Sequence, residues 1–206
     1  MQIANSNPML LDADPTSILN AACMAATLNL PINNSLGFAY IVPYRNKGKA
    51  EAQFQLGYKG FIQLAQRSGQ FERLVSLPVY QNQLMAKDPI SGFKFDWEQE
   101  PAENEQAIGY YAYFKLINGF TAELYMTRKQ IDGHAKRYSQ SFKKGYGVWA
   151  DNYDAMALKT VIKLLLSRMA PLSVDMQKAV LSDQSVVKDV ESGQYEYIDH
   201  QANEAE

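Results

Sequence analysis

The sequence is poor in cysteine and histidine. Its 206 residues contain one cysteine, Cys23, and two histidines, His134 and His200. A lone cysteine excludes a disulfide framework and any zinc site built on cysteine pairs. Neither histidine has a second ligand at metal-binding spacing, so we expect no metal. Cys23 lies in an alanine-rich stretch with helical spacing, and we expect it to fill a small space in the core.

Long apolar runs are missing as well. No stretch approaches the roughly 18 apolar residues that a membrane-spanning helix needs. The N-terminal segment MQIANSNPML has neither the basic region nor the apolar region of a secretory signal. We therefore expect a cytoplasmic protein that does not contact a membrane.

Motifs for nucleotide hydrolysis and for nuclease chemistry are also lacking. The one Gly-Lys pair, Gly48-Lys49, is followed by alanine instead of the serine or threonine of a P-loop. No carboxylate residue stands two positions before a lysine, an arrangement typical of the commonest metal-dependent exonucleases. No nucleophile, base and orienting group can be assembled. The sequence thus predicts a protein that is not an enzyme and needs no cofactor.

One group of acids leaves an alternative open. Asp96, Glu98 and Glu100 alternate along the chain and could form a cluster for a metal ion. The chain would then be a metal-dependent DNA nuclease. Exposed acids at the edge of a strand explain the same pattern, and we favour that interpretation.

Charge is present in abundance and is unevenly distributed. The formal net charge is −2, yet residues 45–73 hold six basic residues against two acids and residues 128–169 hold nine against three. Residues 82–127 and 170–206 are acidic. Two basic blocks in an otherwise acidic chain are typical of a protein that binds a polyanion. From charge alone, two solvated faces without a ligand remain an equal alternative.

The first half of the chain alternates between helical and strand patterns. Asp14-Pro15 is a typical helix start, and Leu30-Pro31 ends that helix. Residues 38–44 and 50–56 alternate in polarity and predict a β-hairpin with one dry and one polar side. A helix is expected over residues 58–66, and strands over residues 71–80 and 93–97. An acidic linker follows over residues 98–106.

The second half predicts a further hairpin and more helices. Residues 108–117 and 120–126 flank Asn118-Gly119, a strong signal for a two-residue hairpin turn. Thr127 resembles the N-cap of a helix that ends at Arg137, a loop follows over 139–148, and helices are expected over 149–169 and 174–181. The predicted fold class is α+β, with antiparallel hairpins forming a sheet that helices cover. Residues 7–181 are expected to form one core, and residues 182–206 an acidic, disordered tail.

The two basic blocks supply the candidate binding residues. Cations neutralise phosphates, amides hydrogen-bond phosphates or base edges, and tyrosine stacks on bases. The first block consists of Arg45, Lys47, Lys49, Gln53, Gln55, Tyr58, Lys59, Gln63 and Arg67. The second block consists of Arg128, Lys129, Lys136, Arg137, Lys143, Lys144, Lys159 and Lys163. Tyr58 is equally well explained as a core aromatic residue and Gln63 as a solvated one, and we expect Trp149 to belong to the core.

Several phrases of the sequence resemble the RecT family of phage and prophage recombinases. The similarity covers residues 7–181 in order, and its most specific phrase is LGYKG-x-IQLA. The matching phrases are AATLNLPI (25–32), LGFAYIVPY (36–44), QFQLGYKGFIQLAQRSGQ (53–70), GYYAYFKLING (109–119), TRKQI (127–131), YDAMALKT (153–160) and SVDMQ (173–177).

The resemblance implies a function. RecT-like proteins bind single-stranded DNA, assemble into rings or helical filaments, and anneal complementary strands without ATP after a phage exonuclease has resected a duplex. It implies a β-β-β-α core, a homo-oligomer, and single-stranded DNA and the annealed duplex intermediate as partners. A phage exonuclease and a host single-strand-binding protein would be further partners. A single-strand cover protein that does not anneal is a second alternative beside the nuclease.

The resemblance also indicates which candidate binding residues are the strongest. It further bears on whether this chain forms filaments. The positions that match the family phrases are Gln53, Gln55, Tyr58, Lys59, Gln63, Arg128, Lys129, Lys159 and Lys163. We expect both blocks to line one groove that follows the sugar-phosphate backbone. Family members usually carry a helical segment ahead of this core that is associated with neighbouring subunits. Only a few residues precede Asn7 here, so the expectation of filaments is weaker than the expectation of strand binding.

Overall fold

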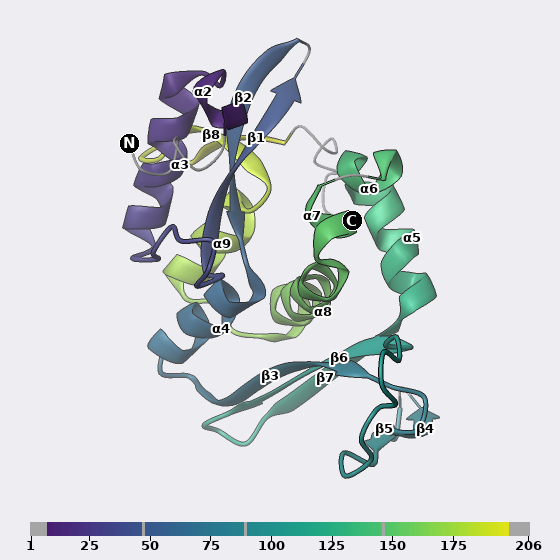
Figure 1. The fold of residues 1–206 in the computed structure, drawn as a ribbon. Coiled ribbons are helices and arrows are strands. Elements are labelled where there is room, and N and C mark those ends of the chain that lie inside the picture. The colour runs from purple at the N-terminus through teal and green to yellow at the C-terminus, as the bar shows by residue number, and fades with distance from the viewer. Residues whose placement is uncertain (1–7, 47, 89, 146, 198–206) are drawn as a thin grey trace. The chain divides into compact units, whose positions relative to one another are not determined.

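The computed structural model describes residues 8–46, 48–88, 90–145 and 147–197 (Figure 1). The fold is mixed α+β, with antiparallel sheets packed against helices, which confirms the predicted fold class. The chain divides into two compact units where the sequence predicted one core. The first unit consists of Met1–Arg67 and Leu172–Glu206, and the second of Ser68–Pro171. No helix of the described ranges is long and apolar enough to cross a membrane.

The first unit is built on a four-stranded antiparallel sheet. Its strand order is β1-β2-β8-β9, so the two ends of the chain meet in one sheet. Its strands are β1 (Ala39–Asn46), β2 (Lys49–Leu56), β8 (Ser185–Asp189) and β9 (Gln194–Tyr197). Its helices are α2 (Pro8–Leu11), α3 (Pro15–Thr27), α4 (Tyr58–Arg67) and α9 (Val174–Ser182).

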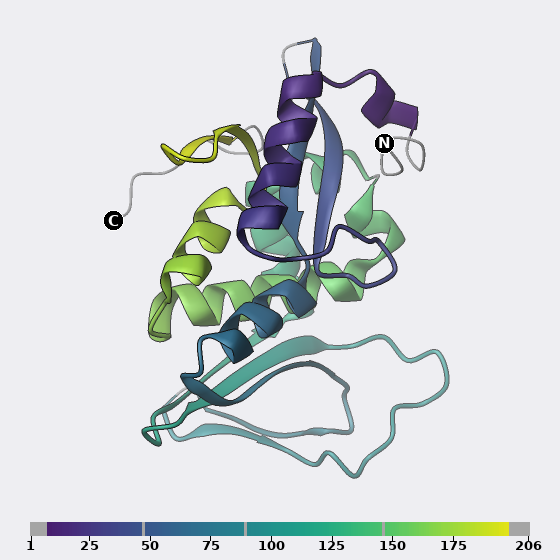
Figure 2. The same cartoon turned by 90° about the vertical axis from the view of Figure 1, so that its left-hand side faces the viewer.

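Helix α3 is fixed to β2 by its first turn. The Asp14 carboxylate accepts a hydrogen bond from the Ser17 amide at 2.9 Å, as expected of an N-cap. The Ser17 hydroxyl oxygen in turn accepts a bond from the Ala52 amide of β2 at 2.8 Å. Met24 and Phe54 are fully buried where the helix lies along the hairpin (Figure 2). Cys23 is exposed, so the prediction that it fills the core is wrong.

Residues 185–197 were expected to belong to a disordered tail and instead form strands β8 and β9. Val186 and Val187 are fully buried, and the Gln184 amide donates to the Phe54 carbonyl at 2.9 Å. The acidic composition of this segment favoured disorder in the prediction, whereas its short apolar stretch packs into the first unit. Of the rest of the predicted tail, Ser182 ends α9 and is buried together with Asp183, and residues 198–206 lie outside the described residues.

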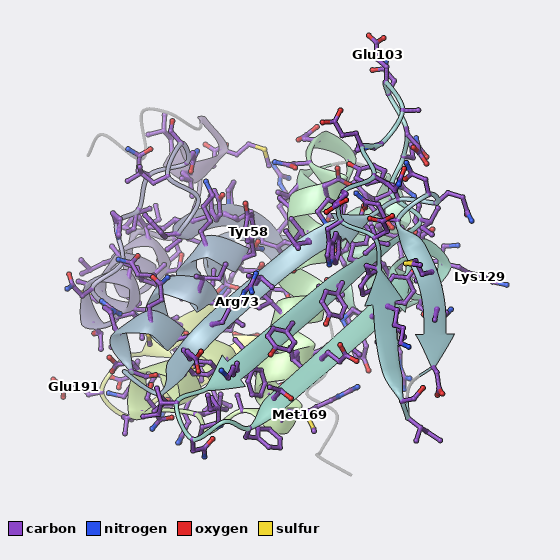
Figure 3. The ribbon with its side chains drawn as sticks, turned by 90° about the horizontal axis from the view of Figure 1, so that it is seen from below. Tyr58, Arg73, Glu103, Lys129, Met169 and Glu191 are labelled. Carbon is purple, nitrogen blue, oxygen red and sulfur yellow. The ribbon has the colours of Figure 1, made fainter. Side chains whose placement is uncertain are left out.

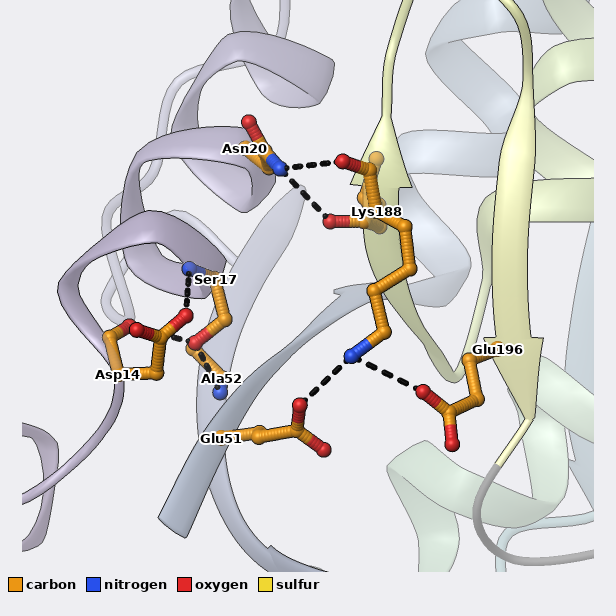
Figure 4. A network of polar contacts seen from close by, with 8 residues as sticks. Asp14, Ser17, Asn20, Glu51, Ala52, Lys188 and Glu196 are labelled. Carbon is orange, nitrogen blue, oxygen red and sulfur yellow. Dashed lines mark hydrogen bonds and ion pairs between the residues drawn. The ribbon is translucent and has the colours of Figure 1, made fainter. Parts of the chain in front are cut away.

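The tail strands are also held by polar contacts (Figure 4). Lys188 of β8 forms ion pairs with Glu51 of β2 at 2.6 Å and with Glu196 of β9 at 2.9 Å. The side-chain amide nitrogen Nδ2 of Asn20 in α3 donates to the backbone carbonyls of Val187 and Lys188. These contacts connect helix α3 and strand β2 to the C-terminal strands β8 and β9 within the first unit.

The second unit is a three-stranded antiparallel sheet with helices on one side. The strand order is β3-β6-β7, and helix α8 packs on all three strands. Its strands are β3 (Phe71–Val79), β6 (Gly109–Leu116) and β7 (Thr121–Thr127), with a separate hairpin of β4 (Leu84–Asp88) and β5 (Gly92–Phe95). Its helices are α5 (Arg128–Tyr138), α6 (Gln140–Lys144), α7 (Val148–Asp151) and α8 (Tyr153–Met169).

Three details of the second unit differ from the sequence-based prediction. The helix expected over 149–169 is broken at Asn152, whose backbone leaves the helical region and whose side chain caps Ala155 of α8. The loop expected over 139–148 contains α6, which begins with Ser139 as its N-cap. Strand β4 was not predicted. Trp149 is buried, as expected for a core residue.

Candidate nucleic-acid interface

Helix α5 is an amphipathic helix with a basic outer side. Its capping box is formed by Thr127, which accepts from the Gln130 amide, and by the Gln130 side chain, which accepts from the Thr127 amide. Ile131 and Ala135 are buried. At about 100° per residue, Lys129 and Lys136 point away from those two buried positions. The capping box thus fixes where the helix begins, and the burial of Ile131 and Ala135 leaves its positive charge on the outer side.

Helix α6 extends this basic side. The cations exposed on the two helices, which we call the α5–α6 basic surface, are Lys129, Lys136, Arg137, Lys143 and Lys144. One acid, Asp132, occurs between residues 128 and 144. Its carboxylate accepts a hydrogen bond from the Tyr153 hydroxyl at 2.6 Å, so it is committed to the start of α8. The result is a surface with five cations and little opposing charge, which suits a polyanion.

Arg128 lies at the root of this surface and stacks on Tyr153. The guanidinium carbon is 3.9 Å from the centre of the Tyr153 ring, the geometry of a cation–π contact. Burial and the hydrogen bond to Asp132 raise the pKa of Tyr153, and the positive charge of Arg128 partly offsets this. Tyr153 is not among the predicted binding residues, although the phrase YDAMALKT contains it.

A second tyrosine–aspartate pair lies beside the first. The Tyr110 hydroxyl donates a short hydrogen bond to Asp154. Burial, together with that bond, raises the pKa of Tyr110. A pocket of about 300 Å³ opens here, lined by residues 105–107, Arg128 and residues 151–154. Arg128 is therefore held by an aromatic ring at a polar opening on the second unit.

The cations of the first block lie on the first unit. Arg45 and Lys49 are exposed at the end of the β1–β2 hairpin, and Lys59 is exposed on α4. Lys47 lies outside the described residues. Tyr58 is partly buried. Arg67 donates to the Leu28 and Asn29 carbonyls at the end of α3, so part of its hydrogen-bonding capacity serves the fold.

Two glutamines of the first block, Gln53 and Gln55, are buried, and Gln63 is partly exposed. The exposed fractions of Gln53 and Gln55 are 0% and 9%, so the polar side expected for β2 is covered. The side-chain amide nitrogen Nε2 of Gln55 donates to the side-chain oxygen Oε1 of Gln53 at 3.1 Å. Gln53 Nε2 and the oxygen Oε1 of Gln63 are buried and have no hydrogen-bond partner in the described part of the chain. Such groups are rare, because an unpaired buried amide is costly.

The two lysines of α8 differ from each other. Lys159 is 4% exposed, whereas Lys163 is partly exposed. Lys159 is therefore buried, as are its neighbours Thr160, Val161 and Ile162 on α8. The place of Lys159 in a basic block did not indicate this burial. Contact between these lysines and DNA, and a groove shared by both blocks, stay predictions.

One of the three acids on which the nuclease alternative depends, Asp96, has a structural role. Asp96 accepts hydrogen bonds from the Glu98 amide and from the Gln99 side chain, both at 3.1 Å, and so stabilises a turn. Among the described residues, no three or more histidine, cysteine, aspartate or glutamate side chains are grouped so that they could hold a metal ion.

Known proteins resemble this chain over most of its length. The sequence model of the RecT family matches residues 1–198. The uncharacterized protein YqaK of Bacillus subtilis (strain 168) is 45% identical over 183 residues, which cover 89% of this chain and 61% of YqaK. Protein RecT of Escherichia coli (strain K12) is 33% identical over 210 residues, which cover 94% of this chain and 74% of RecT. The chain thus spans about three-fifths of YqaK and about three-quarters of RecT.

Proposed function

Because the chain belongs to the RecT family, we propose that it binds single-stranded DNA and anneals complementary strands in homologous recombination without ATP. The observation that supports this most directly is the α5–α6 basic surface. Its five cations are exposed, and Asp132, the acid between them, is bonded to Tyr153. Phosphates would replace water around these side chains and release counterions from the strand.

The proposed mechanism needs no bond-breaking chemistry. Cations neutralise the phosphates of two strands, which lowers their mutual repulsion. Base pairing then supplies the driving force, at about 1.4 kcal/mol per base-pair step. The sequence contains no P-loop, which agrees with annealing that is independent of ATP. Homo-oligomers, a phage exonuclease and a host single-strand-binding protein are the partners that we propose from the family.

The test is an annealing assay with two complementary labelled strands and no nucleotide triphosphate. We expect the protein to accelerate duplex formation and to leave strand length unchanged in magnesium or manganese. Shortened strands would show that the chain is a nuclease, and slower pairing of bound strands would show a cover protein. Absence of binding at low salt would refute the proposal altogether.

A pair of double variants tests the basic surface itself. Lys136→Glu with Lys143→Glu removes two of its cations. Lys94→Glu with Lys178→Glu removes two exposed lysines that lie outside both blocks. The logarithm of affinity falls with the logarithm of salt by about 0.7 per phosphate contact for single strands. The first variant should therefore flatten this slope by about 1.4, twice that value, and the second should not. Equal slopes would remove α5 and α6 from the interface.

A further inference from the structure

The sheet of the second unit has one side that helices do not cover. Side chains alternate along β6, and Tyr110, Ala112 and Phe114 are buried on the side of α8. Tyr111, Tyr113 and Lys115 therefore point to the opposite side. Figure 3 looks onto that opposite side, with Arg73 of β3 labelled on it.

The β4–β5 hairpin covers only one end of this side. Phe93 and Phe95 pack on Tyr111 and Tyr125, with ring centres 4.7 to 6.5 Å apart. Glu123 fixes the hairpin, because its carboxylate accepts from the Phe93 amide at 3.0 Å and from the Tyr111 hydroxyl. The covered end is thus a closed aromatic cluster. Glu123 stands directly opposite Tyr113 in the next row, and its carboxylate is already hydrogen-bonded to the covered end.

The other end is open and combines an aromatic ring with cations. Tyr113 and Val75 stand opposite each other and are both partly exposed, and Leu77 is 39% exposed. Arg73 stands directly opposite Lys115 in the next row. We define the open-face site as Arg73, Val75, Tyr113 and Lys115 of these two rows, together with the exposed Leu77, which stands opposite Tyr111 at the border of the covered end.

The pairing of Arg73 with Lys115 is unfavourable by itself. Like charges directly opposite each other on neighbouring strands repel. Lys115 is compensated by an ion pair with Glu72 at 2.8 Å, which raises its pKa. Arg73 is exposed and forms no ion pair or hydrogen bond with any other described residue. An anion bound between the two rows would relieve this repulsion.

We propose that the open-face site is an additional surface for single-stranded DNA, with a base stacked on Tyr113 and phosphates bound by Arg73 and Lys115. The inference rests on the proposed function. A ring on the central strand of a sheet, beside cations, is how several single-strand-binding modules hold bases, and stacking tolerates any sequence. A protein partner fits less well, since the apolar part is small and lies next to two positive charges. None of the five residues is among the candidate binding residues of the two blocks, although Arg73 is the last cation of residues 45–73.

Photochemical cross-linking tests the site directly. Strands that contain 5-iodouracil are bound to the full chain and irradiated, and the linked peptides are located by mass spectrometry. We expect a cross-link at Tyr113 that persists in Tyr113→Phe and decreases on the order of tenfold in Tyr113→Ala. Arg73→Glu should flatten the salt dependence of binding by about 0.7, and Lys94→Glu should leave it unchanged.

The outcomes separate this inference from the proposed function. If the chain binds and anneals DNA but cross-links only outside β3 and β6, the open-face site is not a DNA surface. If the variants change self-association by light scattering and leave DNA binding unchanged, the face docks a second copy, and the inference is equally wrong. If the wild-type chain binds no single strand at all, the proposed function fails, and the inference fails with it.

Discussion

The guanidinium of Arg128 lies 3.9 Å from the centre of the Tyr153 ring, while the Tyr153 hydroxyl donates to Asp132 at 2.6 Å. Arg128 is the first residue of α5 and Tyr153 the first residue of α8. The two contacts therefore join the starts of two helices, one that carries the α5–α6 basic surface and one that packs on the sheet. They hold the basic helix in a fixed position on the second unit.

This relationship predicts that Arg128→Lys destabilises the protein although the charge is kept. A lysine lacks the planar group that stacks on the ring. We expect a loss of about 0.5 to 1 kcal/mol in the free energy of unfolding, measured by urea denaturation. Arg168→Lys, at an exposed position near the end of α8, is the matched control and should have no effect. Equal losses in both variants would show that the stacking contributes nothing.

Replacement by alanine should change the stability of the chain in opposite directions at two of its glycines. A Cβ at Gly60 of α4 would lie 2.3 Å from the Phe38 carbonyl oxygen, so backbone would have to move. We expect Gly60→Ala to cost about 1 to 3 kcal/mol or more. A Cβ at Gly133 of α5 meets nothing within 4 Å. Gly133→Ala should therefore stabilise the chain by about 0.5 to 1 kcal/mol, because glycine is a poor helix former. Thermal unfolding of both variants measures the two signs, and a common sign would contradict the packing described for Gly60.

The hydrogen bond between Tyr111 and Glu123 should contribute more to stability than the hydroxyl of Tyr113, which is partly exposed. Burial and the bond to Glu123 raise the pKa of Tyr111. Tyr111→Phe leaves the carboxylate short of one donor and should cost about 1 to 3 kcal/mol. Hydrogen exchange should then accelerate at the Phe93 amide, which donates to the same carboxylate. Tyr113→Phe is the control, and exchange that is equally fast in both variants would contradict the role of Glu123 in fixing the hairpin.

The ion pairs of Lys188 should make stability depend on alkaline pH. Burial alone lowers the pKa of this lysine, but the hydrogen bonds to Glu51 and Glu196 and their charges more than offset it, so the pKa is raised above 10.5. A group whose pKa is raised by folding binds its proton more tightly in the folded chain. Its contribution is therefore complete below pH 10.5 and is lost as the pH rises through the higher native value.

Lys188→Met isolates this contribution. Denaturation of the variant and of the wild type should differ most at neutral pH and converge above the native pKa of the lysine. Lys178→Met removes an exposed lysine of α9 and serves as the control, since its difference from the wild type should not vary in this way. A difference that stays constant with pH for Lys188→Met would show that the three residues are not coupled in solution.

The local pattern of the sequence predicted much of the fold. Asp14 and Thr127 start helices as expected, and Asn118-Gly119 turns between β6 and β7. These features are fixed by neighbours within a few residues, through capping bonds and turn geometry. The break at Asn152 escaped prediction, because the apolar pattern runs through it and only the bond of its side chain to Ala155 marks the new start.

For the candidate site, the sequence predicted which residues carry the positive charge, but it did not predict which polar side chains are buried. The surface position of Lys136 follows from charge and helical spacing, and those of Lys143 and Lys144 follow from their charge and from the loop predicted there. The burial of Lys159 and Gln53 does not, since a polar side chain is covered only when elements distant in sequence pack over it.

By itself the sequence determined the two basic blocks, the missing catalytic motifs and the membership of a family, because these depend on residue types and their local order. The tertiary structure decided that residues 185–197 complete the first sheet, that Asp132 is bonded to Tyr153, and that Arg73 stands opposite Lys115. The physical reason is the same in each case. Strand register and side-chain pairing join residues far apart in the chain, and their free energy depends on contacts that no local pattern contains.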